Sequence, residues 1–487
     1  MSSLPKYLAT FSVFFLVSCG GGGGGSDSGV TPVASSGGSS GSSSTTQPSC
    51  TNPHSQAFPS SFMGDFEIPV PTDVFPEGYM KDIQLKDFGP EWVYGNYYRG
   101  GADWSYECTK EEYVQLMYRL TLEEIVKTGG NSVTIVNYGP WEDASDELWV
   151  MSDSQWHISR STVEYIVKTA RELGLKVGYI WQFWAVDKNG KELFKGPPYN
   201  VDMALLDRVS DTYDNFLLET ATWAEDIGIT SLLANFHAFG LSLCGLDCEL
   251  GYPEIIELRD HYMLRLSNRI DAMRERFSGE IVVGAEWNDY RVLEKADRVV
   301  IPMGSLGLSE EEDAEFSVDL AREKVVNSFD NFYRNFYGYD GQKPLGSYYS
   351  TDTVVFSLNP LVQSTQFFNL RGWVEDGFCT SGEVSGRYYD KCMQLHVPID
   401  FSRQAIWLEG VLEAMLVQSS LEFDGIWGGG YFWLTPSLVH DPYEIDIPSV
   451  RQGFPEISQS IRGKPAQNIL RYWFTGEWEE YSPTFSD

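Results

Sequence analysis

Aromatic, acidic and amide side chains gather in several short segments of this 487-residue chain, each close to an apolar run. Trp and Tyr rings stack on the C–H-rich faces of sugar rings, while carboxylates and amides bond sugar hydroxyls. An isolated tryptophan is more often core filling, but here six fall near the ends of apolar runs. This pattern favours contact with a carbohydrate. The residues expected to make it are Asn137, Trp141, Trp181, Trp184, Asn235, His237, Trp287, Asp289, Tyr349, Trp427 and Trp433.

Two carboxylates are the candidate acids for cleaving a glycosidic bond. Glu286 ends an apolar run beside Trp287, a setting expected to raise the pKa of a carboxyl group toward that of a general acid. A structural carboxylate that bonds nearby backbone or Arg291 fits Glu286 nearly as well. Asp352 is the natural second carboxylate, although it fits a turn residue equally well. Further acids stand behind these two: Asp289, Glu142, Asp143 and Asp187.

Other kinds of catalytic site find less support in the sequence. No Ser/His/Asp or Cys/His nucleophile pattern stands out, and the six histidines form no H-E-x-x-H zinc motif. His237 fits a residue that orients a carboxylate or bonds a sugar, and fits a structural histidine equally well. The acidic segment 142–146 is better explained as a solvated loop than as a calcium site. We therefore expect no metal and no cofactor.

Eight apolar runs alternate with amphipathic segments, and they predict the elements that position these residues. Near-continuous apolar runs are typical of strands covered on both faces. Eight strands interleaved with helices favour an α/β fold, a (β/α)8 TIM barrel, whose working face is the carboxyl end of the strands. No glycine-rich phosphate loop follows any strand, which disfavours a nucleotide-binding fold. The predicted strands are 92–98, 131–137, 175–184, 229–236, 280–287, 297–303, 343–349 and 424–433, and the predicted helices are 111–128, 161–173, 203–227, 254–277, 310–337 and 401–421.

Two stretches lie outside this repeat. Residues 50–90 form an N-terminal extension expected to wrap across a barrel end. Residues 351–399 form a long loop insertion after the seventh predicted strand, and a loop of that length is usually functional or a subdomain. The barrel domain is thus expected to span 50–487.

The first residues indicate export. Lys6 precedes an apolar run, 11–17, that is too short to span a membrane and is typical of a signal peptide over residues 1–18. The ending Leu16-Val17-Ser18-Cys19 resembles the bacterial lipobox, which implies cleavage before Cys19 and lipidation of that cysteine. The Gly/Ser-rich stretch 19–49 is expected to be a flexible linker. The resemblance implies anchoring in the bacterial envelope, with the outer membrane as the default destination.

The cysteine count and the net charge limit the compartments and the binding partners that fit this protein. Six further cysteines in an oxidising compartment suggest disulfides, with fifteen possible connectivities. We expect the local pairs to form, which leaves the two earliest residues together: Cys244–Cys248, Cys379–Cys392 and Cys50–Cys108. The formal net charge of −34 disfavours nucleic acids, anionic membrane surfaces and strongly acidic polymers as partners. We expect a monomer whose partner is a neutral or weakly charged carbohydrate.

Several short motifs resemble one known family. The segment 460–466, which ends Gly463-Lys464-Pro465-Ala466, is similar to the start of the last helix in TIM-barrel glycoside hydrolases, the β-mannanase-like members of a large retaining clan. Lys343–Gly346 resembles their strand-seven opening, and 424–433 resembles their strand eight. The resemblance covers most of residues 90–476 and implies a carbohydrate-cleaving enzyme.

The departures from that family concern its two catalytic glutamates. The clan places an acid/base glutamate after an Asn at the end of strand four, whereas here Asn235 is followed by Phe236-His237. Its nucleophilic glutamate at the end of strand seven is replaced by Tyr348, Tyr349 and Asp352. The sequence therefore leaves two hypotheses. One is a glycoside hydrolase that uses relocated acids, and the other is a non-catalytic glycan-binding lipoprotein on a degenerate barrel.

Overall fold

A computed structural model gives the fold of this chain. The residues that the structure describes are 63–64, 66–85, 110–144, 147–148, 158–187, 203–234, 238–239, 252–284, 292, 295–303, 308, 310–328, 354–358, 401–417, 423–427, 431–432 and 461–480.

Parallel strands close into a barrel. The pairing runs β1–β2–β4–β5–β7–β8–β9–β10 and returns to β1, which pairs with both β2 and β10. These strands are β1 Met80–Leu85, β2 Ser132–Ala144, β4 Lys176–Asp187, β5 Ser231–Leu233, β7 Glu280–Gly284, β8 Arg298–Met303, β9 Val354–Leu358 and β10 Gly425–Ile426. Three short strands join them: β3 Glu147–Leu148 antiparallel to β2, β6 Ala238–Phe239 beside β4, and β11 Tyr431–Phe432 beside β1. The predicted (β/α)8 fold is confirmed.

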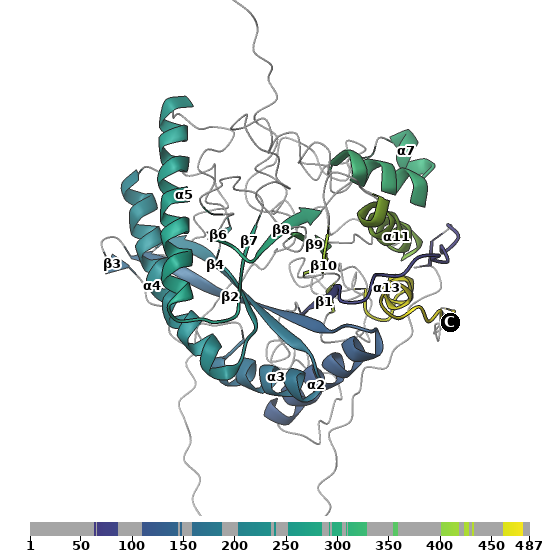
Figure 1. Cartoon of the computed structure of the whole chain (residues 1–487), viewed down its shortest axis with the longest axis horizontal. Helices are drawn as coiled ribbons and strands as arrows, with labels where there is room; N and C mark the ends of the chain where they lie inside the picture. The colour runs from purple at the N-terminus through teal and green to yellow at the C-terminus, as the bar shows by residue number, and fades with distance from the viewer. Residues whose placement is uncertain are drawn as a thin grey trace, which may run out of the picture.

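Helices surround the strands, as Figure 1 shows. The helices are α2 Lys110–Lys127, α3 Arg160–Glu172, α4 Met203–Ile227, α5 Tyr252–Arg274, α7 Glu310–Ala314, α11 Phe401–Val417 and α13 Pro465–Thr475. Helix α13 begins at Pro465, directly after Lys464, as the family resemblance implied. The predicted helix 310–337 is instead interrupted after α7, and helical structure resumes at residue 318.

The barrel has an inner and an outer core. The side chains inside the strand ring form a small apolar cluster: Met80, Val136, Ile180, Leu233, Val282, Val300 and Trp427. Alternate positions on the same strands face outward, where Ile83, Val177 and Leu232 pack with helix residues in a much larger cluster. Because strand side chains alternate between faces, this division fixes which positions point toward the axis and which toward the helices.

Capping residues and glycines mark the ends of the helices that precede the strands. Helix α3 begins after Ser159, whose hydroxyl accepts a hydrogen bond from Thr162 N at 3.2 Å, and its last residue, Glu172, is followed two positions later by Gly174 with φ +83°. Helix α2 ends at Lys127 and is likewise followed by Gly129, which has φ +89°. A Cβ at Gly129 would lie 2.9 Å from Phe474 Cβ, so glycine also permits close approach to α13.

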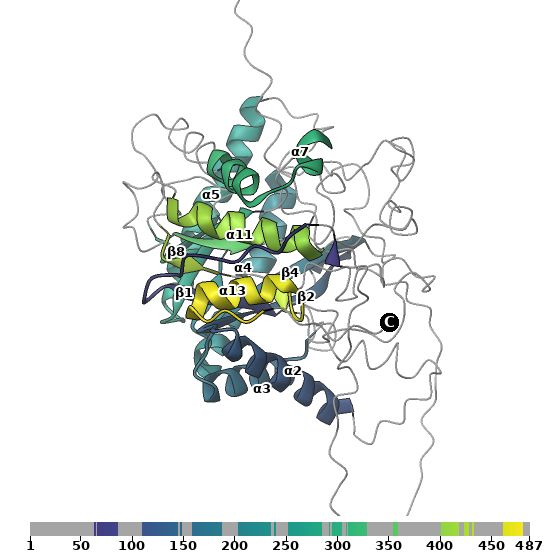
Figure 2. The ribbon, with the colours of Figure 1, turned by 90° about the vertical axis from the view of Figure 1, so that its right-hand side faces the viewer.

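The N-terminal extension lies against two helices. Phe66 N donates to Ser402 Oγ at the start of α11 (3.3 Å), and Phe75 N donates to Trp473 O near the end of α13 (2.8 Å). Phe75 is buried against Trp473, Phe474 and Tyr79. Figure 2 shows this N-terminal segment, residues 66–79, running beside α11 and α13. Both helices run from the carboxyl to the amino ends of the strands, so the segment does the same before it enters β1.

Two predicted strands were wrong. The first barrel strand is β1 Met80–Leu85, not 92–98, and the seventh is β9 Val354–Leu358, not 343–349. The segments 92–98 and 343–349 themselves lie outside the described residues. The boundary of the seventh strand changes the place of Asp352, which comes before β9 in the chain rather than after it.

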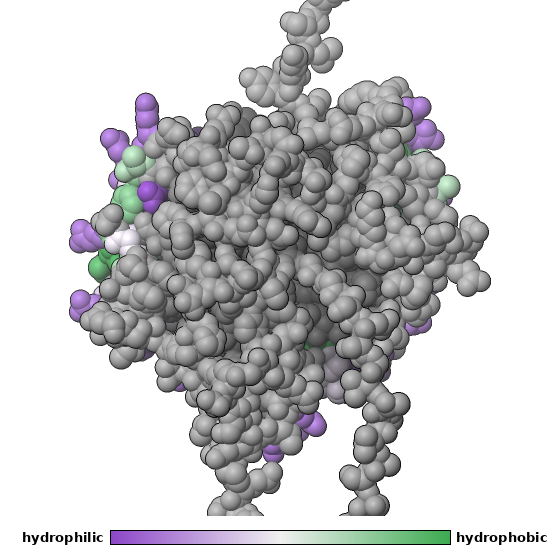
Figure 3. Space-filling view, turned by 180° about the vertical axis from the view of Figure 1, so that it is seen from behind, coloured by the Kyte–Doolittle hydropathy of each residue, from purple (hydrophilic) through white to green (hydrophobic). Residues whose placement is uncertain are grey.

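Few large apolar side chains are exposed among the residues that the structure describes. Figure 3 shows hydrophilic residues and small hydrophobic spots at the edge of the face that it presents. The large apolar side chains exposed among the described residues are Val70, Val74, Val126, Leu264, Leu416 and Val417. Among the helices that the structure describes, none combines the length and the apolar character needed to cross a membrane.

Candidate functional site

The candidate site is the carboxyl end of the barrel strands, which we call the mouth. Strands β2 and β4 pair over twelve positions in parallel register, from Ser132 with Lys176 to Asp143 with Asp187. Their neighbours β1 and β5 are much shorter, so the paired strands continue beyond them at the mouth. On the far side of β4, β6 aligns Phe239 with Trp184. The aromatic and acidic runs after Asn137 and Trp181 are therefore brought side by side.

A buried arginine of the outer helix layer holds the end of β5, the fourth barrel strand. Arg269 of α5 donates from Nη1 to the carbonyl oxygen of Ala234 at 2.9 Å. Its side chain is fully buried, pairs with Asp214 of α4 and lies over the Tyr213 ring, 4.8 Å from its centroid. Ala234 immediately precedes Asn235, so this ion pair positions the start of the loop at the mouth.

Arg269 belongs to a larger ionic network between α4 and α5. Arg265 pairs with Asp211, with Asp207 at 2.8 Å and with Asp214 at 3.1 Å. His261 Nε2 lies 2.6 Å from Asp207 Oδ1, and this hydrogen bond lowers the pKa of the Asp207 carboxyl. The sequence analysis missed the network. The sequence does contain a signal for it: aspartates recur at helical spacing in α4 (207, 211 and 214), and arginines do so in α5 (265 and 269).

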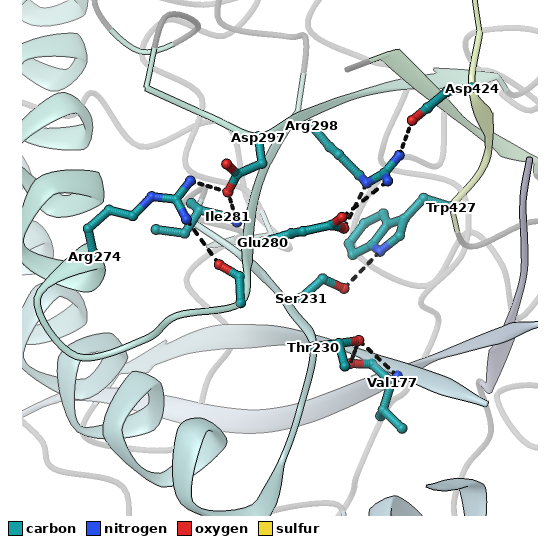
Figure 4. A network of polar contacts seen from close by, with 11 residues as sticks. Val177, Thr230, Ser231, Arg274, Glu280, Ile281, Asp297, Arg298, Asp424 and Trp427 are labelled. Carbon is teal, nitrogen blue, oxygen red and sulfur yellow. Dashed lines mark hydrogen bonds and ion pairs between the residues drawn. The ribbon is translucent and has the colours of Figure 1, made fainter. Parts of the chain in front are cut away.

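Figure 4 shows a second network of polar contacts, which includes the first residues of β7 and β8. Arg298 of β8 bonds Glu280 of β7 at 2.7 Å and also pairs with Asp424, just before β10. Burial raises the pKa of the Asp424 carboxyl to about 6, although the Arg298 guanidinium opposes this effect. Glu280 and Arg298 are the first residues of their strands and Asp424 directly precedes β10, so the network lies at the amino ends of the strands and not at the mouth.

Two predicted sugar-contacting residues point away from the mouth. Trp181 is 2% exposed and packs on Phe216 of α4, with ring centroids 4.9 Å apart. Asn137 is completely buried: its Nδ2 donates to Ile158 O at 2.8 Å, and its Oδ1 accepts from Ile158 N at 3.0 Å. Both assignments were wrong, because these positions lie on the outer face of the sheet and serve to hold the helix layer.

Trp427 also proved to be a core residue. It is 3% exposed within the inner cluster, and its Nε1 lies 3.4 Å from Ser231 Oγ. The indole fits because Gly178 has no side chain: a Cβ there would lie 2.6 Å from Thr134 Oγ1 and 3.1 Å from Trp427 Nε1. Trp427 therefore fills the barrel interior, and its predicted role in stacking on a sugar was wrong.

The side chains of the remaining predicted residues are not described by the structure. For Trp141 and Trp184 only the backbone, in β2 and β4, is described. The others lie outside the described residues: Asn235, His237, Glu286, Trp287, Asp289, Tyr349, Asp352, Trp433, Cys19, Cys50, Cys108, Cys244, Cys248, Cys379 and Cys392. Within the described ranges, no group of three or more His, Cys, Asp or Glu side chains is placed to hold a metal ion.

Models of known protein families give no match to this chain, and neither do the sequences of curated proteins. Solved structures do resemble it. A GH113 β-1,4-mannanase aligns with 82% of this chain and 99% of its own, at 13% identity and a TM-score of 0.45. The GH113 β-mannanase AaManA from Alicyclobacillus acidocaldarius aligns with 82% and 98%, at 13% identity and 0.44. A family 5 mannosidase from Rhizomucor miehei aligns with 81% and 92%, at 10% identity and 0.40.

The barrel itself rests on the strand pairings described above.

Proposed function

We propose that the protein is a glycoside hydrolase that binds and cleaves a neutral polysaccharide at the mouth of its barrel. The observation that carries the proposal is the long pairing of β2 and β4. It sets two runs rich in aromatic, acidic and amide residues side by side, with Pro140 level with Trp184 and Asp143 level with Asp187. In barrels of this kind the carboxyl ends of the strands form the active site. The net charge of −34 favours a neutral substrate.

Strand alternation separates the candidate stacking residues. Position 184 is four residues after Ile180, a member of the inner cluster, so it belongs to the inner face of β4. Position 181 belongs to the outer face. Trp184 is therefore the tryptophan of β4 that we propose for stacking on a sugar ring.

For the chemistry we propose Glu286 as general acid. It comes two residues after β7 ends at Gly284, which puts it at the carboxyl end of the fifth barrel strand. Asp352 precedes β9, so the reason for choosing it as the second carboxylate no longer holds. Asp289, which follows the fifth barrel strand in the sequence, is the second carboxylate that we propose instead. The distance between the two acids would set retention or inversion at the anomeric carbon.

A specific observation favours glycan binding without cleavage as a second candidate. The seventh strand ends at Leu358, and the residues that follow, Asn359-Pro360-Leu361-Val362-Gln363, include no carboxylate. A barrel without an acid at that position would keep the surface that binds sugars while lacking one of the two groups that cleave them.

One experiment separates the two candidates. The full chain is incubated with mannan, galactan, xylan and β-glucan, and both bound polysaccharide and new reducing ends are measured. We expect release of reducing ends, abolished by Glu286→Gln and retained by Glu123→Gln, a change on the exposed face of α2. Release that survives Glu286→Gln would remove Glu286 from the mechanism. Binding that weakens in Trp184→Ala, with no release by the unmodified chain, would establish the non-catalytic candidate.

We also propose that lipid on Cys19 holds the protein to the bacterial envelope, through the linker 19–49. The supports are the lipobox-like Leu16-Val17-Ser18-Cys19 and the glycine run that follows it. In cells, Cys19→Ala should move the protein from the membrane fraction to the soluble fraction and abolish labelling by a radioactive fatty acid. Unchanged labelling would refute lipidation of this cysteine.

A further inference from the structure

One polar side chain on the inner face of the barrel has no hydrogen-bond partner among the residues that the structure describes. It belongs to Gln84, near the end of β1. We propose that the Gln84 amide hydrogen-bonds a hydroxyl group of the glycan bound at the mouth, a contact that rests on the proposed function and that the sequence did not indicate.

The position of Gln84 follows from the alternation of β1. Met80 belongs to the inner cluster, and Asp82 accepts a hydrogen bond from Thr134 Oγ1 of the neighbouring β2 at 2.7 Å. Ile83 and Leu85 instead pack in the outer core. Gln84 therefore faces inward. It is the last inward position before β1 ends, which makes it the residue of this face closest to the mouth.

The carbonyl oxygen of the Gln84 amide is buried without a hydrogen bond. Gln84 is 5% exposed, and its Oε1 is fully buried with no hydrogen bond. Thr134, which is level with Gln84 in β2, uses its hydroxyl to bond Asp82. Within the part of the chain that the structure describes, no other group bonds the Gln84 side chain. Because a buried amide without partners is destabilising, its presence points to a partner from outside the chain.

On its other side, β1 pairs with the eighth strand in two separate places. Met80 and Lys81 pair with Gly425 and Ile426, and Gln84 and Leu85 pair with Tyr431 and Phe432. In the sequence, residues 427–430 separate the two pairings. Three of these four are glycines, a residue type that has no side chain to offer the amide.

A sugar hydroxyl suits this group chemically. An amide side chain offers both donors and an acceptor, and a hydroxyl group offers both in return. The amide carries no charge, which accords with a neutral glycan. A trapped water molecule would satisfy the same atoms, so the experiment has to separate a water site from a glycan site.

The substitution Gln84→Met keeps the length of the side chain and removes both polar atoms. We expect two opposite effects. The melting temperature should rise by about 1–3 °C, because an unpartnered buried amide is removed. The affinity should fall about tenfold, the effect of one lost hydrogen bond of about 1.4 kcal/mol. Titration calorimetry with mannohexaose, galactohexaose, xylohexaose and cellohexaose measures the affinity of the full chain. Gln115→Met, at the surface of α2, is the matched control and should change neither value.

Each outcome decides the matter. Higher stability with weaker binding supports the proposal. Higher stability with unchanged binding overturns it and identifies a buried amide without a glycan role. Lower stability with weaker binding also overturns it, because Gln84 would then be a structural residue or hold a structural water. If the unmodified chain binds none of the four oligosaccharides, the proposed function fails first and this inference falls with it.

Discussion

A buried carboxyl group far from the mouth gives the most quantitative prediction. Glu409 of α11 is 2% exposed and accepts a hydrogen bond from Trp473 Nε1 of α13 at 2.7 Å. Burial raises the pKa of Glu409 from 4.5 to about 7, and the nearby Glu413 and Asp73 carboxylates act in the same direction, against the Trp473 hydrogen bond. Ionisation of Glu409 therefore opposes the packing of α11 against α13.

The sign of the effect follows from the two pKa values. Because the folded pKa is above the unfolded one, the contribution of Glu409 to stability is fully present below pH 4.5 and is lost as the pH rises through about 7. Each pH unit in that window is worth about 1.4 kcal/mol, so by pH 8 the native state has lost on the order of 3 kcal/mol. Most of that loss, about 2.5 kcal/mol, falls between pH 5 and pH 8.

The substitution Glu409→Gln removes the ionisation and keeps an oxygen for Trp473. Urea unfolding at pH 5, 6, 7 and 8 gives the free energy of unfolding of both proteins. We expect the variant to gain about 2–3 kcal/mol relative to the unmodified chain between pH 5 and pH 8, whatever constant offset the amide introduces. A difference that stays flat across this range would refute the reasoning. Glu123→Gln, on the 38% exposed side chain that pairs with Arg119, should give a flat difference below about 0.5 kcal/mol.

Two further predictions concern buried contacts that stabilise the fold, made by Arg269 and by Phe75. Arg269→Met should lower the free energy of unfolding by about 3 kcal/mol, because it breaks a buried ion pair and frees the Ala234 carbonyl. Arg265→Met, which leaves Ala234 bonded, should cost about 1 kcal/mol in the same urea assay, and equal costs would contradict the role given to Arg269. Phe75→Ala should cost about 3–4 kcal/mol by thermal and urea unfolding, against less than about 0.5 kcal/mol for the exposed Val74→Ala.

Where strands are apolar throughout, the sequence predicted them to within a few residues. Strands β7 and β8 and the first part of β2 and β4 are runs of β-branched residues that follow helices, and glycines such as Gly129 and Gly174 mark the helix ends. These are local signals, and they sufficed for the fold class. The last helix was found because the motif around Lys464 directly precedes α13.

Strand β1 was missed for a physical reason. Its inward positions include Asp82 and Gln84, so it lacks the apolar run of a strand buried on both faces, whereas the aromatic segment 92–98 has one. Strand β9 has a suitable apolar run, but the family-like Lys343–Gly346 placed the prediction earlier in the chain. A polar side chain inside a barrel is detectable only once the pairing partners are known.

The candidate site was harder to predict because a shift of one residue exchanges the two faces of a strand. Trp181 and Trp184 come from one apolar run, yet three positions separate them and only position 184 shares a face with Ile180. The contribution of Arg269 depends on a contact between segments 35 residues apart, from α5 to Ala234, which no local pattern encodes.

The path of the N-terminal segment sets how the barrel would carry a mechanical load. Residue 66 is held near the start of α11, at the mouth end, and the chain then runs to the opposite end before it enters β1. A pull on a tether at residue 66 would thus be applied to the contacts of Phe66 and Phe75 with the two helices before it reached the sheet. The segment would detach first from α11 and then from α13. The barrel strands would stay paired while these contacts broke.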